Sequence, residues 1–318
     1  MTHARGAPAR STLSIGLASA LNAMRLSDAL DVFVLQLRAD GRSPHTIANY
    51  QRHVGALDAW LAARGHSADL DAITPALLAE YLADDDVRRS GRGGVRSTST
   101  VNAVRTSLRV VFGWLHDAGH TRINPARLIR RAMCSPPPPR SLSDAQVDAL
   151  LTALDAVRGE AARRDRLLVR LLLATGMRLG SALALDVEDL DLATGAITLR
   201  RVKRDRVERV FLGREIREQF AEHLRRQRLT RGPLFRGPQG ERLVDRHARR
   251  RICDLLDRIG AHDATVHSLR HTFATRLLRT TGDLFLVKRA LLHRSIASTA
   301  VYLDVSDERL RAAMDGAR

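Results

Sequence analysis

Four consecutive prolines at 136–139 divide this 318-residue chain into two parts. Proline lacks a backbone N–H and fixes φ, so the run cannot continue a helix and behaves as a stiff, extended spacer. Each flanking part is long enough to bury a hydrophobic core of its own. We therefore predict a linker over 134–140 between domains at 26–133 and 141–318, preceded by a disordered tail over 1–25.

The N-terminal part carries helix signals throughout its length. Ser43-Pro44 and Thr74-Pro75 each combine an N-cap residue with proline at the first helical position. Together with the spacing of apolar residues, they predict one helix capped by Ser27 and ended by Gly41, and others over 43–65, 74–82 and 100–118. Residues 83–99 are acidic and then rich in Gly, Ser and Arg, so we expect a loop there. The first domain is predicted to be all-helical.

The C-terminal part is predicted to be mostly helical with one small antiparallel sheet. Ser143 and Gln146 form a capping box that opens a helix through Leu154. Apolar spacing predicts further helices over 164–174, 214–229, 245–259, 268–280 and 283–292, and a last short helix over 307–314. Alternation is convincing only at 196–201 and 207–212, which flank a charged turn and predict a hairpin. The expected fold class is therefore mainly α, in two domains.

Charge and composition narrow the class of partner. The formal net charge is +17, and both halves of the chain are basic, which favours a polyanion such as the phosphate backbone of DNA. Arginine enrichment in a GC-rich genome is an alternative explanation for much of this excess. No apolar run approaches the roughly 20 residues that span a bilayer. The two cysteines, Cys134 and Cys253, have no metal-type spacing, so we expect neither a disulfide framework nor a zinc ribbon, and a cytoplasmic location.

Lysine is nearly absent from the basic residues. Among 52 lysine and arginine residues only Lys203 and Lys288 are lysine. A lysine can release a proton when neighbouring cations lower its pKa, whereas arginine effectively cannot. A lysine that persists in such a chain is therefore a candidate general acid.

The second domain also contains candidates for binding and cleaving a phosphodiester. Arg178 follows a predicted helix end, and its guanidinium can hold two phosphate oxygens. His267, Arg270 and His271 lie within one turn at a helix start, which favours anions. A zinc site at the two histidines is an alternative, but Arg270 would repel the ion and the glutamate of a metalloprotease motif is missing. We expect His271 to be a buried histidine that is hydrogen-bonded to the backbone.

The joint pattern of these residues resembles the tyrosine recombinase family, which includes phage integrases and Xer-type recombinases. The order is Arg178, Lys203, His267-x-x-Arg270, His293 and Tyr302, with twenty-three residues from Arg270 to His293 and nine more to Tyr302. The resemblance implies that Arg178 and Arg270 clamp the phosphate, that His267 and His293 support it, that Lys203 is the catalytic lysine, and that Tyr302 is the nucleophile.

The resemblance extends over roughly residues 27–315. In the N-terminal part, Ser43-Pro44-His45-Thr46 with Tyr50, and Asn124-Pro125, are similar to the core-binding domain of these proteins. Two positions depart from the usual pattern. Ser181 stands where the family usually has an acidic residue, and Leu292 stands where it usually has glycine.

The resemblance implies a site-specific DNA recombinase that works through a 3′-phosphotyrosyl intermediate, with no cofactor and no metal. Its partner would be double-stranded DNA, in the nucleoid. On this DNA it would act as a homo-tetramer, or as a hetero-tetramer with a second recombinase, through a Holliday junction. The helix over 307–314 would dock on a neighbouring protomer or on its own domain. The alternatives are a topoisomerase-like DNA-relaxing enzyme and, because of Ser181 and Leu292, a catalytically weakened or inactive DNA-binding paralogue.

Overall fold

The computed structural model describes residues 24–91, 93–134, 140–199 and 208–293, together with Ser295, Thr299 and Tyr302. Most of the predicted tail, the four prolines and the helix predicted over 307–314 lie outside the described residues. The chain divides into two compact units, Met1–Pro136 and Pro137–Arg318. The finer limits of the linker and the two domains stay predictions. No helix within the described ranges is long and apolar enough to cross a membrane.

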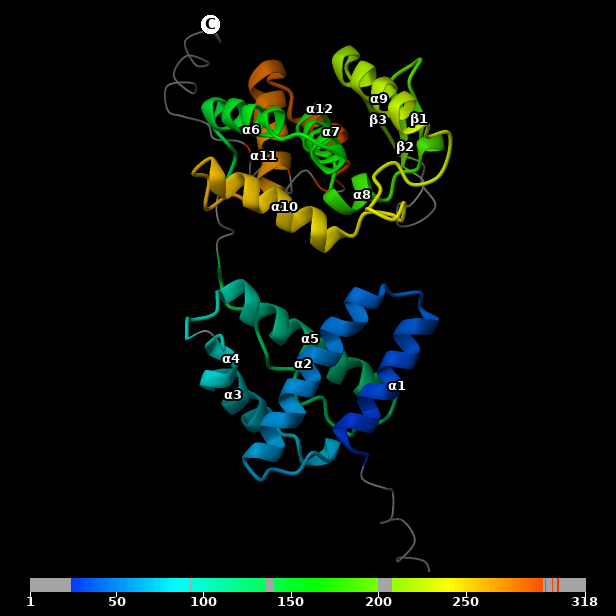
Figure 1. Ribbon diagram of the computed structural model, residues 1–318. Coiled ribbons are helices and arrows are strands. Elements are labelled where there is room, and N and C mark those ends of the chain that lie inside the picture. Colours follow the sequence, from blue (N-terminus) through cyan, green and yellow to red (C-terminus); the bar gives the residue numbers. More distant parts are fainter. Residues whose placement is uncertain are drawn as a thin grey trace, which may run out of the picture. The chain divides into compact units, whose positions relative to one another are not determined.

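The first unit is built from helices, as predicted. They are α1 (Leu26–Ala39), α2 (Pro44–Ala63), α3 (Pro75–Ala83), α4 (Asp85–Arg88) and α5 (Thr98–Asp117), with a 3-10 turn at Leu70–Ala72. Helices α1, α2 and α5 pack against one another (Figure 1). Phe33 lies in this core, with ring centroids 5.3 Å from Tyr50 and 5.4 Å from Trp114.

Two of the predicted helix starts are confirmed in detail. The Ser43 side chain accepts a hydrogen bond from the Thr46 backbone N–H at the start of α2, and Thr74 accepts one from Leu77 at the start of α3. The cap predicted at Ser27 is wrong. Helix α1 begins two residues earlier, with Arg25 at the N-cap.

The loop predicted over 83–99 is wrong in part. Asp84 accepts a hydrogen bond from the Asp86 backbone N–H, and this cap opens the single-turn helix α4. Ser97 caps α5, which therefore begins two residues before the predicted start. Asp84 and Ser97 each cap a helix through a local side-chain contact. The sequence did not reveal them as caps, because the composition of this segment is typical of loops.

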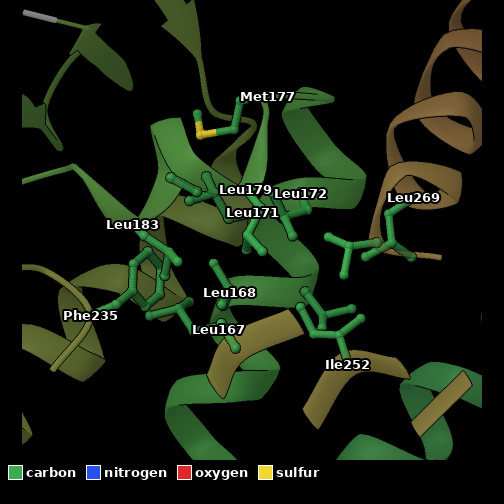
Figure 2. Packing of buried hydrophobic residues seen from close by; sticks show 14 of the residues in the cluster. Leu167, Leu168, Leu171, Leu172, Met177, Leu179, Leu183, Phe235, Ile252 and Leu269 are labelled. Atoms are coloured by element: carbon green, nitrogen blue, oxygen red, sulfur yellow. The ribbon is translucent and has the colours of Figure 1, made fainter. Parts of the chain in front are cut away.

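The second unit surrounds one helix that is buried along most of its length. Its helices are α6 (Asp144–Ala156), α7 (Glu160–Thr175), α8 (Leu179–Leu183), α9 (Arg214–Gln227), α10 (Asp245–Arg258), α11 (Val266–Thr281) and α12 (Leu284–Ala290). Helix α7 contacts α6, α8, α9, α10 and α11. Figure 2 shows four of its leucines, Leu167, Leu168, Leu171 and Leu172, packed with Ile252 of α10 and Leu269 of α11. The helix is therefore the axis of the core on which the other elements are placed.

The sheet has one strand more than predicted. Strands β1 (Leu190–Asp191), β2 (Ala196–Leu199) and β3 (Glu208–Phe211) are antiparallel in that order, with Ile197 opposite Val210. The predicted hairpin strands are confirmed in their described parts. The sequence missed β1, because two residues are too few to show alternation.

Candidate active site

Helix α7 ends at a left-handed glycine that leads to Arg178. Gly176 caps the helix with a φ of 61°, and a Cβ at this position would lie 2.3 Å from Cδ1 of Phe273. Only glycine satisfies both the backbone conformation and the space. Two residues later the chain is extended at Arg178, whose side chain is exposed at the N-cap of α8.

Arg270 is a buried arginine that links three helix ends. It is 3% exposed, near the start of α11. Its Nη1 donates to the Gly176 carbonyl at 2.6 Å, and its Nη2 donates to the Leu291 carbonyl at 2.8 Å. Burial, and secondarily the charge of Arg178, lower the pKa of Arg270 to about 10, so the guanidinium is charged at neutral pH. These bonds use only part of its five N–H donors, which leaves others for an anion.

A capping box sets the start of α11 and, with it, the two histidines. The Thr265 side chain accepts from the His267 backbone N–H at 3.2 Å, and Ser268 Oγ accepts from the Thr265 N–H at 3.0 Å. His267 therefore lies in the first turn, exposed, and His271 lies one turn later. Their rings meet edge to face with centroids 4.6 Å apart.

Helix α12 ends in a left-handed turn that places His293. The Leu292 N–H donates to the Arg289 carbonyl at 3.1 Å and the His293 N–H to the Lys288 carbonyl at 3.0 Å, the paired bonds of a Schellman motif. Leu292 has a φ of 55°, in the region that favours glycine. The residue that departs from the family pattern thus adopts the backbone conformation that a glycine would have.

Thr299 connects His293 with Tyr302. Its side chain is fully buried, its Oγ1 lies 2.9 Å from Nδ1 of His293, and its carbonyl accepts from the Tyr302 backbone N–H at 3.0 Å. One residue therefore holds both the imidazole and the backbone of the candidate nucleophile.

Tyr302 is buried against α11 and α12. It is 7% exposed and packs with Ala274, Leu278, Val287 and Leu291. Its hydroxyl lies 2.8 Å from Nδ1 of His271. Burial raises the pKa of Tyr302, so its hydroxyl is protonated at neutral pH. The backbone partner predicted for His271 is wrong, because this half-buried imidazole contacts the tyrosine hydroxyl instead.

The histidines of the site are neutral. Desolvation, followed by the neighbouring His267 and Arg270, lowers the pKa of His271 to about 4. Desolvation, followed by the charges of Arg270 and Arg178, lowers the pKa of His293 to about 4 as well. The pKa of His267 is lowered too, first by desolvation and then by the same two arginines. At pH 7 these rings can accept protons or hydrogen bonds.

The structure brings most of the predicted residues together. Arg270, His267, His293 and Tyr302 share one connected cluster at the ends of α7, α11 and α12, and the charge of Arg178 reaches it. Lys203 lies outside the described residues, between β2 and β3 in the chain.

Arg178 has a serine, Ser181, at the position where the family usually has an acidic residue. No carboxylate within the described part of the chain forms an ion pair with this arginine. The backbone N–H of Ser181 donates to the Arg178 carbonyl at 2.9 Å, a bond of the first turn of α8 that does not involve the guanidinium. The exposed guanidinium therefore has no acidic support from the position where the family usually provides it.

The sequence drew attention to His271 but not to its contact with Tyr302, and it gave no indication of Thr299. His271 contacts Tyr302, which is 31 residues away, and Thr299 contacts His293, which is six residues away. No local sequence pattern reveals either contact. His271 stood out in the sequence as the i, i+4 partner of His267, but that spacing does not reveal a contact with Tyr302. Thr299 offered no signal, since a buried threonine is not distinctive in a sequence.

Known proteins match both units of the chain. The profile of the phage integrase family matches residues 140–309, and that of the phage integrase N-terminal SAM-like domain matches residues 30–119. A tyrosine recombinase XerD of Ralstonia nicotianae is 31% identical over 279 residues, or 86% of this chain and 87% of that protein. A tyrosine recombinase XerC of Mycobacterium tuberculosis is 35% identical over 284 residues, or 86% of this chain and 92% of that protein.

Solved structures show the same fold. A XerH site-specific recombinase bound to its difH substrate in a pre-cleavage complex aligns with a TM-score of 0.70 at 23% identity, over 92% of this chain and 84% of that chain. A lambda integrase dimer bound to a COC′ core site aligns with a TM-score of 0.68 at 20% identity, over 89% and 78%. With both profiles and both relatives in agreement, the chain belongs to the phage integrase family of tyrosine recombinases.

Proposed function

We propose that this protein is a site-specific DNA recombinase that cleaves and rejoins DNA through a 3′-phosphotyrosyl intermediate. The observation that carries the proposal is the connection of Tyr302, through His271 and through Thr299 and His293, to the cluster that holds the buried Arg270. A phenol beside guanidinium groups is what nucleophilic attack on a phosphodiester requires.

Each residue has a distinct role in the proposed cleavage. Arg178 and Arg270 neutralise charge on the non-bridging phosphate oxygens, with His267 and His293 at their side. The Tyr302 oxygen attacks phosphorus, and the bond to the 5′-oxygen breaks. Lys203 protonates that leaving oxygen, because an ammonium with a lowered pKa can give up a proton that a guanidinium would keep.

The phosphotyrosyl bond conserves the energy of the bond that was broken, so no ATP and no cofactor are needed. A second 5′-hydroxyl attacks it in the reverse direction and completes strand exchange. Four protomers, all of this chain or shared with a second recombinase, would hold two double-stranded DNA sites. The net charge of +17 supports phosphate-backbone binding by such an assembly.

A suicide substrate tests the proposal. Duplexes are first selected from a random library by binding to the full-length protein, and the selected duplex is then prepared as a series with single nicks at successive positions. Cleavage beside a nick releases a short fragment, which traps the covalent adduct. We expect an adduct that resists denaturation with the wild-type chain and none with Tyr302→Phe.

Other outcomes separate the alternatives. Specific binding with no adduct at any nick position would overturn the proposal and favour an inactive DNA-binding paralogue. Relaxation of a supercoiled plasmid without strand exchange between two sites would favour a topoisomerase. Lys203→Arg should cleave slowly with an ordinary 5′-oxygen, and cleavage at the wild-type rate would remove Lys203 from its acid role.

A further inference from the structure

The hydroxyl of Tyr302 already has a basic partner that the family resemblance does not assign. Nδ1 of His271 lies 2.8 Å from that hydroxyl, and the two ring centroids are 5.4 Å apart with planes inclined at 57°. His271 directly follows Arg270 on α11, so the same helix turn carries a phosphate-binding candidate and the partner of the nucleophile.

The other histidines of the cluster are engaged differently. Nδ1 of His293 is 2.9 Å from the Thr299 hydroxyl, and His267 meets His271 with its ring edge to face. Within the described residues, His271 is the side-chain base that contacts the Tyr302 oxygen. His271 therefore differs from His267 and His293, the two histidines that the resemblance names, in its direct contact with the nucleophile.

The pair is suited to proton transfer from tyrosine to histidine. A neutral imidazole has one unprotonated nitrogen, and its Nε2–H tautomer leaves Nδ1 free to accept from the phenol. Desolvation and the neighbouring His267 and Arg270 keep the pKa of His271 near 4, so the ring is unprotonated at pH 7. The buried phenol has a raised pKa and does not supply a phenolate by itself.

We propose that His271 is a catalytic residue that accepts the Tyr302 proton during DNA cleavage. The proposal rests on the proposed function, in which Tyr302 is the nucleophile. The bond from the Tyr302 oxygen to phosphorus forms as the bond from phosphorus to the 5′-oxygen breaks. The Tyr302 proton moves to Nδ1 of His271, and the leaving 5′-oxygen takes its proton from Lys203. In rejoining, His271 returns the proton to the departing phenol oxygen.

The timing of the transfer follows from acidity. In the resting site the phenol is a much weaker acid than the imidazolium, so the proton stays on Tyr302. As the phenol oxygen bonds to phosphorus its O–H becomes strongly acidic, and transfer to His271 becomes favourable within the same step. A positioned base of this kind contributes on the order of 100- to 10,000-fold to a rate.

Two substitutions at His271 and one control test the proposal. The amide oxygen of His271→Asn can occupy the place of Nδ1 and accept the hydrogen bond, but it cannot take the proton. His271→Ala leaves a space that added imidazole can enter. His262→Asn makes the same substitution at an exposed histidine that pairs with Asp257, outside the cluster. Single-turnover cleavage of the nicked duplex is measured for each full-length variant, with circular dichroism and DNA binding to check folding.

We expect His271→Asn to bind the duplex as the wild type does and to cleave it about 100-fold more slowly. His262→Asn should cleave at the wild-type rate. Imidazole should restore part of the rate of His271→Ala, in proportion to its unprotonated fraction. The wild-type rate should also decline at acid pH as His271 is protonated, in a field set by His267, Arg270, His293 and Tyr302. The decline should be less steep in the Asn variant, in which His293 still titrates in the same range.

Other results would contradict the proposed role of His271. Cleavage by His271→Asn within about 3-fold of the wild type would overturn the proposal, because the base would be dispensable. A slow Ala variant that imidazole does not rescue, or a slow Asn variant whose acid decline is as steep as that of the wild type, would reduce His271 to a positioning role. If the wild-type chain forms no adduct, the proposed function itself fails, and that outcome differs from the other three.

Discussion

At the residue scale, the site depends on side chains that join distant segments. Arg270 bonds two carbonyls that are 94 and 21 residues away, and His271 meets a hydroxyl 31 residues away. Each contact fixes one helix end relative to another. The positions of Arg178, His293 and Tyr302 therefore depend on α11 as much as on their own segments.

Thr299 gives a prediction at this scale. Thr299→Val keeps the shape of the side chain and removes the hydroxyl that lies 2.9 Å from Nδ1 of His293. A hydrogen bond of this kind contributes about 0.5 to 1.5 kcal/mol, so single-turnover cleavage should slow by roughly 2- to 13-fold. Thr299→Ser keeps the hydroxyl and should retain most of the rate. The opposite order, with Val fast and Ser slow, would show that packing and not the hydrogen bond matters at this position.

Residue identities were easier to predict than their contacts. The candidate phosphate-binding and nucleophilic residues stood out from their order and spacing in the chain. The partner of His271 did not, because it is determined by how the chain returns to α11 after α12. For the same reason the sequence could not show that the Gly176 carbonyl accepts from Arg270.

At the scale of elements, local signals were reliable where they were complete. Ser43-Pro44, Thr74-Pro75 and the capping box of Ser143 with Gln146 each mark a helix start that the structure has. Helix α4 and strand β1 were missed because each is a few residues long, too short for a period to be visible. Their formation depends on a single cap or on pairing with a neighbouring strand.

The end of α12 gives the next prediction. Leu292 has a φ of 55°, and a non-glycine residue in this region is strained by about 1 kcal/mol or more. Its side chain is half-buried and packs on the core of the second unit, so truncation also loses contacts. Leu292→Ala loses the contacts and keeps the strain, whereas Leu292→Gly loses both.

We therefore expect Leu292→Gly to be more stable than Leu292→Ala by about 1 kcal/mol, measured as the free energy of unfolding in urea. Cleavage rates of the two variants should follow the same order, because the turn places His293. Equal stabilities, or a more stable Ala variant, would mean that the left-handed conformation at this residue is not retained in solution.

At the scale of the whole molecule, two units with separate hydrophobic cores share one chain. The basic excess is distributed over both, as expected for a protein whose two parts bind the same polyanion. The family profiles match one unit each, at 30–119 and 140–309. The four prolines lie between these two matched segments.

The pH dependence of stability is a prediction for the whole fold. His271 and His293 have folded pKa values of about 4, against about 6.5 in the unfolded chain. Between these values the unfolded state binds more protons, so their contribution to stability is complete above pH 6.5 and is lost as the pH falls toward 4. The urea midpoint should therefore fall from pH 7 to pH 5.

The double variant His271→Asn with His293→Asn isolates this effect. It should show a smaller fall between pH 7 and pH 5 than the wild type, even if its stability at pH 7 is lower. An unchanged fall would assign the pH dependence to other groups and would contradict the neutral state of these two rings in the folded protein.

Mapping the covalent adduct shows whether Tyr302 attacks the phosphodiester. The adduct from the nicked duplex is trimmed with nuclease, digested with protease and sequenced by mass spectrometry. The chain has three tyrosines, and the other two, Tyr50 and Tyr81, lie in the first unit. We expect a nucleotide joined through its 3′-phosphate to the peptide that contains Tyr302. A 5′-phosphate linkage, or attachment at any other residue, would contradict it.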